Sequence, residues 1–220
     1  SAFPMFSADN QYKGSMSIVR DVTSEKLTEA RQNAILNISK IGNSETIKIS
    51  EVCAKIHQEL QKVLEVKNLY VALYDKSLDE ISFPYVKDEM ANASAFQTRK
   101  TSNGLTEKVL FNQQPELIQQ GTRLECYRSI GHIPACWLGV PLINKNDAIG
   151  VLAVVSYDNA QAFTEEDQKY LIYAGNQIAA VLQRTKAQKE IVEKATQLIS
   201  ERKNTLKHQS KLLSTQLNPH

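Results

Sequence analysis

Two thiols and an imidazole stand close together in the middle of the chain, and such side chains often hold zinc. Cys126, His132 and Cys136 have the spacing Cys-x5-His-x3-Cys. Common zinc sites combine four ligands, with shorter spacings inside each ligand pair. Because this spacing matches none of them and no fourth ligand stands nearby, the sequence predicts no metal site. With Cys53 the cysteines number three, and this odd count favours reduced thiols over a disulfide framework.

The histidine at the end of the chain is the second group that could do chemistry. The unperturbed pKa of histidine, roughly 6.5, leaves His220 mostly neutral at cytoplasmic pH, and a neutral imidazole is a nucleophile. Asn218-Pro219 ends or kinks the helical pattern before it. A helix that delivers a histidine and then stops predicts a chain cut from a longer protein. The sequence contains no phosphate-binding glycine loop, so we expect no enzymatic activity of this chain by itself.

The composition is that of a soluble protein with one substantial core. Hydrophobic residues make up 42% and charged residues 23% of the 220 residues, and the formal net charge is +2. This charge gives no general case for nucleic acid, and the basic residues over 184–211 are typical of a solvated helix face. No run approaches the roughly 18 apolar residues of a membrane span, and the N-terminus lacks a signal-peptide pattern. We therefore expect a cytoplasmic segment without a membrane span or a nucleic-acid partner.

Periodicity divides the chain into the elements that position these side chains. A turn signal at Asp9-Asn10 precedes a β-run over 15–22. Apolar residues at helical spacing predict helices over 24–42 and 50–65, and a hydroxyl cap at Thr164 opens a long helix without a stop signal before Pro219. A shorter helix begins at 104 and ends before 115. Apolar runs predict strands over 69–75, 80–86, 136–143 and 148–157.

The four strands form two hairpins around short polar turns, so they predict an antiparallel sheet. The longer helices have apolar stripes that need a common partner, and we expect segments 35–41, 50–65 and 165–184 together on one face of the sheet. A polar loop is expected over 91–103. The fold class is therefore α+β with a long C-terminal helix. Cys53 stands on the apolar side of its helix, and we expect a buried, unreactive thiol.

The long C-terminal helix has a seven-residue repeat with one apolar seam and one polar seam. The apolar seam contains Ile178, Thr185, Val192, Ile199, Leu206 and Leu213. The companion positions, three residues further on, are Val181, Gln188, Ala195, Arg202, Gln209 and Gln216. Polar residues in such a seam specify register at a cost in stability. The pattern predicts a weak parallel coiled-coil dimer suited to switching, and leucine at 202 and 209 is expected to tighten it.

Several motifs follow one another in the order found in one sensory family. The helix pair is followed by Y-V-A-L-Y-D, G-L-T, W-L-G-V-P-L, I-G-V-L-A-V and F-T-E-E-D. With these motifs, residues 35–183 resemble a GAF domain, a small-molecule sensory fold. The resemblance implies an antiparallel sheet with helices packed on one face.

The two flanks resemble other parts of a sensor histidine kinase. S-I-V-R-D-V-T-S-E-K resembles the end of a PAS domain, and Q-L-N-P-H resembles the start of the phosphoacceptor region. The resemblance implies a PAS, GAF and kinase array in which His220 is the phosphoacceptor of the parent protein-histidine kinase. It divides the chain into a PAS-like end (1–22), a connecting helix (23–42), a GAF-like domain (35–183), a coiled-coil signalling helix (184–217) and the start of the phosphoacceptor motif (218–220).

The GAF resemblance also implies a ligand pocket lined by aromatic residues of the predicted strands, each of which can instead face the core. The residues around Cys126 are not the context in which GAF relatives attach a bilin. Asn144-Lys145 is not followed by the rest of the cyclic-nucleotide signature. We expect no cofactor. The candidate ligand-binding residues are Tyr70, Tyr74, Phe83, Tyr85, Trp137 and Tyr157.

Two functions from different classes follow. In the first, a GAF module of a two-component sensor histidine kinase binds a small ligand and biases a dimeric output helix. In the second, the domain binds no ligand and is a dimerising spacer that relays a signal from an upstream PAS domain. Both imply a homodimer through the N- and C-terminal helices and a response regulator as partner of the parent kinase. A cavity with converging polar groups favours the sensor, and an interior filled by its own aromatic rings favours the spacer.

Overall fold

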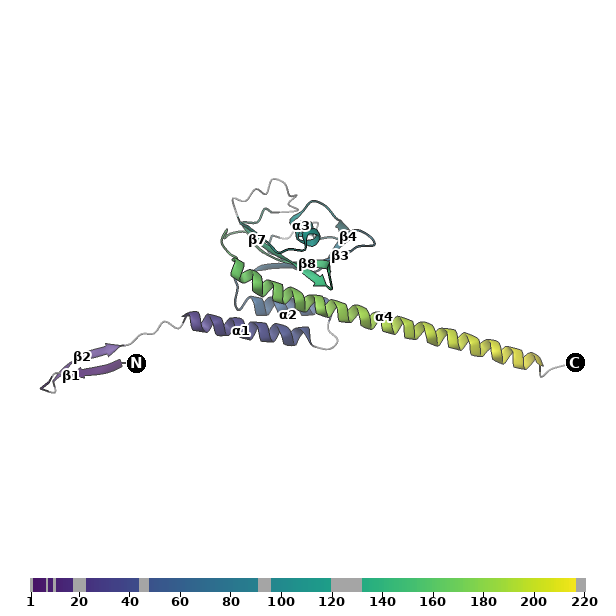
Figure 1. The fold of residues 1–220 in the computed structure, drawn as a ribbon, viewed down its shortest axis with the longest axis horizontal. Coiled ribbons are helices and arrows are strands. Elements are labelled where there is room, and N and C mark those ends of the chain that lie inside the picture. Colours follow the sequence, from purple (N-terminus) through teal and green to yellow (C-terminus); the bar gives the residue numbers. More distant parts are fainter. Residues whose placement is uncertain are drawn as a thin grey trace.

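Two apolar hairpins form the middle of a six-stranded antiparallel sheet (Figure 1). The computed structural model describes residues 2–6, 8–9, 11–17, 23–43, 48–90, 96–119 and 132–216. The strand order is β5-β4-β3-β8-β7-β6, so the long apolar strand β8 lies beside β3 and β7, inside the sheet. The strands are β3 (Asn68–Asp75), β4 (Glu80–Lys87), β5 (Arg99–Lys100), β6 (Glu116–Gln119), β7 (Cys136–Asn144) and β8 (Asp147–Ser156).

The four strands predicted from apolar runs are confirmed, and the two edge strands are additions. β5 lies inside the segment 91–103 that polarity predicts as a loop, and β6 contains Leu117 and Ile118. Two and four residues are too few to establish an alternating pattern, so pairing with β4 and β7 decides their conformation.

The helices lie on both sides of this sheet. α1 (Thr23–Gly42), α2 (Ile49–Leu60) and α4 (Glu165–Gln216) pack on one face, as the apolar stripes predict, and α3 (Leu105–Asn112) packs on the other (Figure 1). α2 ends before the predicted 65 because a turn follows Leu60. That turn still buries Leu64 in the same core, which is why the apolar pattern of the helix extends past its end.

The alternation of side chains along the central strands produces two separate cores. Leu69 and Val71 of β3 face the helices α1, α2 and α4, while Tyr70 and Ala72 face α3. All four are nearly inaccessible to solvent. The central strands are therefore covered on both faces, as their continuous apolar runs predict.

The N-terminal residues form a hairpin of β1 (Ala2–Phe6) and β2 (Tyr12–Ser17). The predicted β-run over 15–22 overlaps the end of β2, and its residues 18–22 lie outside the described residues. Cys126 and the segment 218–220, with His220, also lie outside them.

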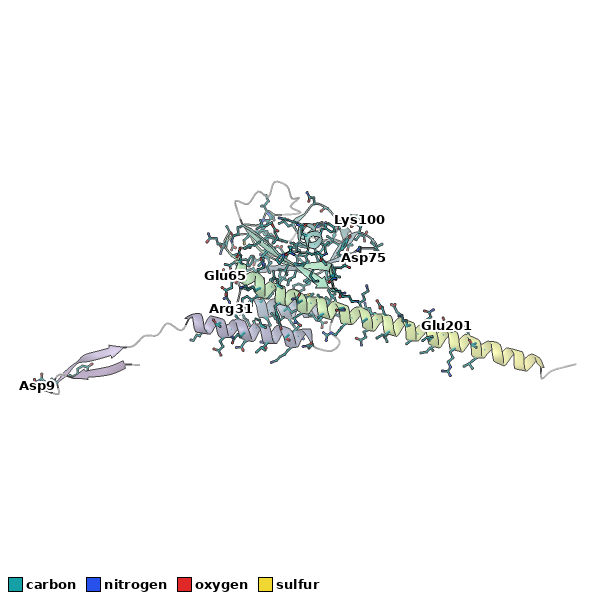
Figure 2. All side chains as sticks on the ribbon, in the orientation of Figure 1. Asp9, Arg31, Glu65, Asp75, Lys100 and Glu201 are labelled. Atoms are coloured by element: carbon teal, nitrogen blue, oxygen red, sulfur yellow. The ribbon has the colours of Figure 1, made fainter. Side chains whose placement is uncertain are left out.

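The helix α4 begins in the core and continues far beyond it. Thr164 and Asp167 form a reciprocal cap, in which the Asp167 amide donates to the Thr164 hydroxyl and the Thr164 amide donates to the Asp167 carboxylate. The helix has 52 residues, which corresponds to about 78 Å. Its described side chains from 183 to 207 are exposed, and Figure 2 shows Glu201 on the part that projects past the sheet. Within the described ranges, no helix combines the length and apolar character that a bilayer crossing requires.

Cys53 is fully buried, as predicted, and its thiol is expected to resist alkylation. Burial raises the pKa of Cys53 to about 12, and the reactive form is the thiolate. Native-state treatment with N-ethylmaleimide followed by mass spectrometry should leave Cys53 unmodified, whereas labelling in guanidinium should be complete. Native labelling of Cys53 at the denatured rate would contradict the packing of α2.

Candidate functional site

A cavity of about 100 Å³ lies on the α3 side of the sheet. It is smaller than the roughly 300–1,000 Å³ of sites for drug-sized molecules, so it suits a ligand of few heavy atoms. Strands β3, β4 and β7 supply aromatic rings to its wall, and the first turn of α3 supplies polar groups. The rings that line it are Tyr70, Phe83, Phe96, Trp137 and Tyr157.

A chain of hydrogen bonds joins three elements behind this wall. The Trp137 indole Nε1 donates to the Tyr70 hydroxyl at 3.1 Å, and that hydroxyl lies 2.9 Å from the Thr106 hydroxyl. Burial raises the pKa of Tyr70, so its hydroxyl stays protonated and can donate to Thr106. These hydrogen bonds hold β7, β3 and α3 in fixed positions around the cavity.

The orientation of Trp137 depends on a glycine two residues further along β7. A Cβ atom built on Gly139 would overlap the indole ring. The glycine in W-L-G-V-P-L therefore gives the ring room to lie along its own strand, next to the cavity.

Arg99 and Glu107 are oppositely charged residues in the lining of this cavity. They form an ion pair in which the Arg99 side chain is 22% exposed and that of Glu107 is 2% exposed. Glu107 Oε1 also accepts from the amide and the hydroxyl of Ser102, at 3.0 and 2.9 Å. Burial alone would raise the pKa of Glu107, but the hydrogen bond and charge of Arg99, together with Ser102, bring it below its ordinary value. The carboxylate is therefore ionised at neutral pH.

Two groups of this ion pair have no hydrogen-bond partner within the described part of the chain. They are Glu107 Oε2 and Arg99 Nε, and both are shielded from solvent. Glu107 and Arg99 are both lining residues of the cavity, so one acceptor and one donor without a partner among the described residues lie in its wall.

A second carboxylate lines the same cavity from the end of β4. The Tyr157 hydroxyl donates to Asp88 Oδ2 at 2.8 Å, and burial and this carboxylate raise the pKa of Tyr157. The His132 ring contacts the Tyr157 ring with centroids 6.4 Å apart. The lining thus combines two carboxylates with one guanidinium and several rings.

Four of the six predicted aromatic residues line this cavity, namely Tyr70, Phe83, Trp137 and Tyr157, and Tyr85 does not. Tyr85 is paired with Val71 and packs in the core under the helices, where its hydroxyl lies 2.9 Å from His57 Nδ1. A β-bulge in β4 opposite Ala72 shifts the register, so Phe83 and Tyr85 lie on opposite faces although they stand two positions apart, the spacing at which strand residues normally share a face. Tyr85 therefore lies on the face of the sheet opposite this cavity.

Tyr74 also lies outside the cavity, near the other end of the sheet. Its ring contacts that of Phe111 edge to face, with centroids 5.9 Å apart, and its hydroxyl donates to Asp79 at 3.1 Å. Tyr74 and Phe111 line a separate, wider depression beside Lys186 of α4. Tyr74 is thus part of a surface groove rather than of the aromatic cavity.

Sequence reasoning missed Asp88, Phe96, Arg99 and Glu107. Phe96 and Arg99 stand in the segment predicted as a loop, and a glutamate in the first turn of a helix is ordinarily a favourable, solvated residue. His132 and Cys136, two of the three residues weighed as metal ligands, lie in the described part of the chain. In that part, no cluster of three or more histidine, cysteine or acidic residues could hold a metal ion.

A family model described as "GAF domain" matches residues 46–183. A search of curated proteins finds no match to the sequence.

Solved structures share the architecture at low sequence identity. The GAF domain of an Acinetobacter phosphoenolpyruvate-protein phosphotransferase has a TM-score of 0.60 at 16% identity, covering 75% of this chain and 97% of its own. The free methionine-R-sulfoxide reductase of Neisseria meningitidis gives 0.61 at 16%, with coverages of 78% and 99%. The GAF domain of a candidate sensor histidine kinase from Pseudomonas syringae pv. tomato gives 0.55 at 12%, again with 78% and 99%. At these identities the likeness concerns the fold.

The ion pair leads to a prediction about stability and pH. Glu107→Gln should lower the free energy of unfolding at pH 7 by about 3 kcal/mol, because it leaves Arg99 without its buried counter-ion. Since the folded pKa of Glu107 is depressed, its stabilisation is present above the unfolded pKa of roughly 4.3 and is lost as the pH falls through the folded value. Urea titrations should therefore show the difference from wild type narrowing below about pH 4.

The matched control is Glu116→Gln. Glu116 pairs with Lys108, but the two side chains are 30% and 23% exposed. Its loss should cost less than about 1 kcal/mol. Equal effects of the two substitutions would show that the burial of Glu107 adds nothing.

Proposed function

Since the chain belongs to the GAF domain family, we propose that it is the ligand-binding, signal-transmitting module of a two-component sensor histidine kinase. In this proposal the aromatic cavity receives a small ligand, and α4 carries the response to the next domain. The proposal rests on the arrangement of α4, which is part of the core at its start and the exit from the domain at its end.

The coupling element between cavity and helix is the strand β7. Trp137 of β7 lines the cavity, whereas Val140 and Leu142 of the same strand face α4. Gly175 of α4 lies so close to this strand that its Cβ position would be 3.3 Å from both side chains. A ligand that moves Trp137 therefore acts on a strand that α4 touches directly.

The exit part of α4 carries apolar side chains with no partner among the described residues. Ile191, Val192, Leu198, Ile199 and Leu206 are each more than half exposed. A long helix without tertiary contacts is marginally stable in water, so a second copy of the same helix is the natural partner for this stripe. Leu36 of α1 is 57% exposed as well and would extend the dimer contact to the N-terminal helix.

The dimer explains how such a module serves a histidine kinase. Two parallel copies of α4 would present two phosphoacceptor histidines side by side, and His220 is that residue by resemblance. The parent kinase would pass the phosphoryl group to a response regulator in the cytoplasm, and the present chain would have no catalytic activity alone. A solved GAF domain described as part of a candidate sensor histidine kinase has the same fold.

The polar seam gives the first test of this function. Arg202 is exposed and stands three residues after Ile199, in the proposed dimer seam. Arg202→Leu should tighten the dimer by about tenfold or more in dissociation constant, because burial of a leucine side chain contributes about 1.5–3 kcal/mol. Sedimentation velocity over a concentration series measures this constant.

The control is Lys207→Leu, which makes the same change of charge and size about 140° further round the helix. It should leave the constant unchanged. A chain that remains monomeric at every concentration, in both variants, would contradict the dimeric output helix.

A second candidate function is the ligand-free relay, and the contact between α1 and α4 favours it. Arg31 of α1 donates to Glu166 at 2.9 Å and to Asp167 at 3.4 Å, and its guanidinium lies 5.1 Å from the Tyr170 ring centroid. Arg184 of α4 donates to the Gly42 carbonyl at the end of α1. An upstream domain could therefore act on α4 through α1 without any ligand.

This relay leads to a separate prediction. Arg31→Ala should loosen α1 from α4, because it removes both ion pairs and the contact with the Tyr170 ring. Hydrogen exchange of the α1 amides should then accelerate, by about tenfold if the lost contacts contribute about 1.4 kcal/mol, while that of β8 stays slow. Lys40→Ala, an exposed position on the same helix, is the control and should change neither. An unchanged rate of α1 amide exchange in Arg31→Ala would contradict the relay from α1 to α4.

A further inference from the structure

We propose that the aromatic cavity binds a small primary amine, as the ammonium ion, that carries an oxygen acceptor next to its amino group. The inference rests on the proposed ligand-binding function and specifies the class of the ligand. Amino alcohols and amino acids share this chemistry.

The first support is the unused oxygen of Glu107. Three donors, from Arg99 and Ser102, converge on Oε1, and no described donor reaches Oε2. A buried carboxylate oxygen without a donor is unfavourable, so a ligand that brings N–H groups is stabilised there. An ammonium group provides three such donors and a compensating charge.

The second support is the balance of charge and ring faces in the lining. Two carboxyl side chains, those of Asp88 and Glu107, line the cavity together with the His132 imidazole and one guanidinium, that of Arg99, which is already paired with Glu107. Aromatic rings also line the cavity, among them those of Tyr70, Trp137 and Phe96, and an aromatic ring attracts a cation to its negative face.

The third support explains the oxygen acceptor. All hydrogen bonds that Arg99 makes in the described structure leave from Nη1, and Nε is a buried donor without an acceptor. Nε and Oε2 belong to the same ion pair, so one ligand with an ammonium group beside an oxygen can satisfy both. A plain alkylammonium satisfies only Oε2.

The test uses Trp137, the single tryptophan of the chain, as the reporter in the cavity wall. The full 220-residue chain is titrated at constant ionic strength with ethanolammonium, propylammonium, tetramethylammonium and propionate, while tryptophan fluorescence is recorded. We expect a saturable change with ethanolammonium and at least tenfold weaker binding of propylammonium, which has no oxygen. Tetramethylammonium, without an N–H donor, and propionate, without a positive charge, should not saturate.

Variants then connect the binding to the named carboxylates. Glu107→Gln should weaken ethanolammonium binding at least tenfold. Because that variant is also destabilised, Asp88→Asn is the second variant, with circular dichroism as the check of folding, and it too should weaken binding severalfold. Asp158→Asn is the matched control, since Asp158 is exposed and does not line the cavity.

Preferred binding of propionate, equal binding of propylammonium and ethanolammonium, or no saturation by any ammonium probe would overturn the inference. So would unchanged binding in both Glu107→Gln and Asp88→Asn. The dimerisation of α4 is measured by sedimentation without a ligand, so a wrong ligand class and a wrong output function give different results.

Discussion

The burial of the central strands on both faces is the constraint on which the other features depend. Each strand of β3, β8 and β7 sends alternate side chains into two cores, so Leu138 and Val140 lie against the helices while Trp137 lies against the cavity. A shift of the strand register by one residue would exchange the side chains of the two cores. The same strands therefore hold the cavity on one face and the helices α1, α2 and α4 on the other.

The sequence predicted the helices and strands that have a regular apolar pattern. The short edge strands and the face on which Tyr85 lies depend on pairing between strands. The hairpins, the three helices on one face and the capped start of α4 at Thr164 follow from local patterns, and they are confirmed. The edge strands β5 and β6 are too short for a pattern. The position of Tyr85 depends on a bulge in β4, and the register shift that reverses its face is a property of the β3–β4 pair, not of the run of residues in β4.

The polar residues of the site could not be predicted from the sequence for a different reason. Arg99 and Glu107 stand eight residues apart on a short edge strand and on a helix, and each is unremarkable in its own segment. The two residues become a buried ion pair only when the fold brings them together and excludes water. Each charge then needs the other to offset its loss of solvation. Aromatic residues could be predicted as pocket candidates, since their type alone signals burial, whereas a buried ion pair is a property of two segments at once.

The coupling energy expected of the proposed module fits a shift between two packing states of α4 better than a rearrangement of the whole fold. Ligand-dependent coupling in proteins is typically about 1–3 kcal/mol, and the contacts of α4 with β7 and α1 are of the kind that such an energy can redistribute. The first part of α4 is held by Ile178 in the core and by Arg31 at its cap, whereas its described side chains from 183 to 207 are exposed. In the proposed dimer, a small displacement at β7 would therefore have little effect on the stability of the domain and a large effect on how two exit helices pack. In that dimer the apolar seam would stabilise the helix pair, and the polar seam would keep the pair weak enough to respond.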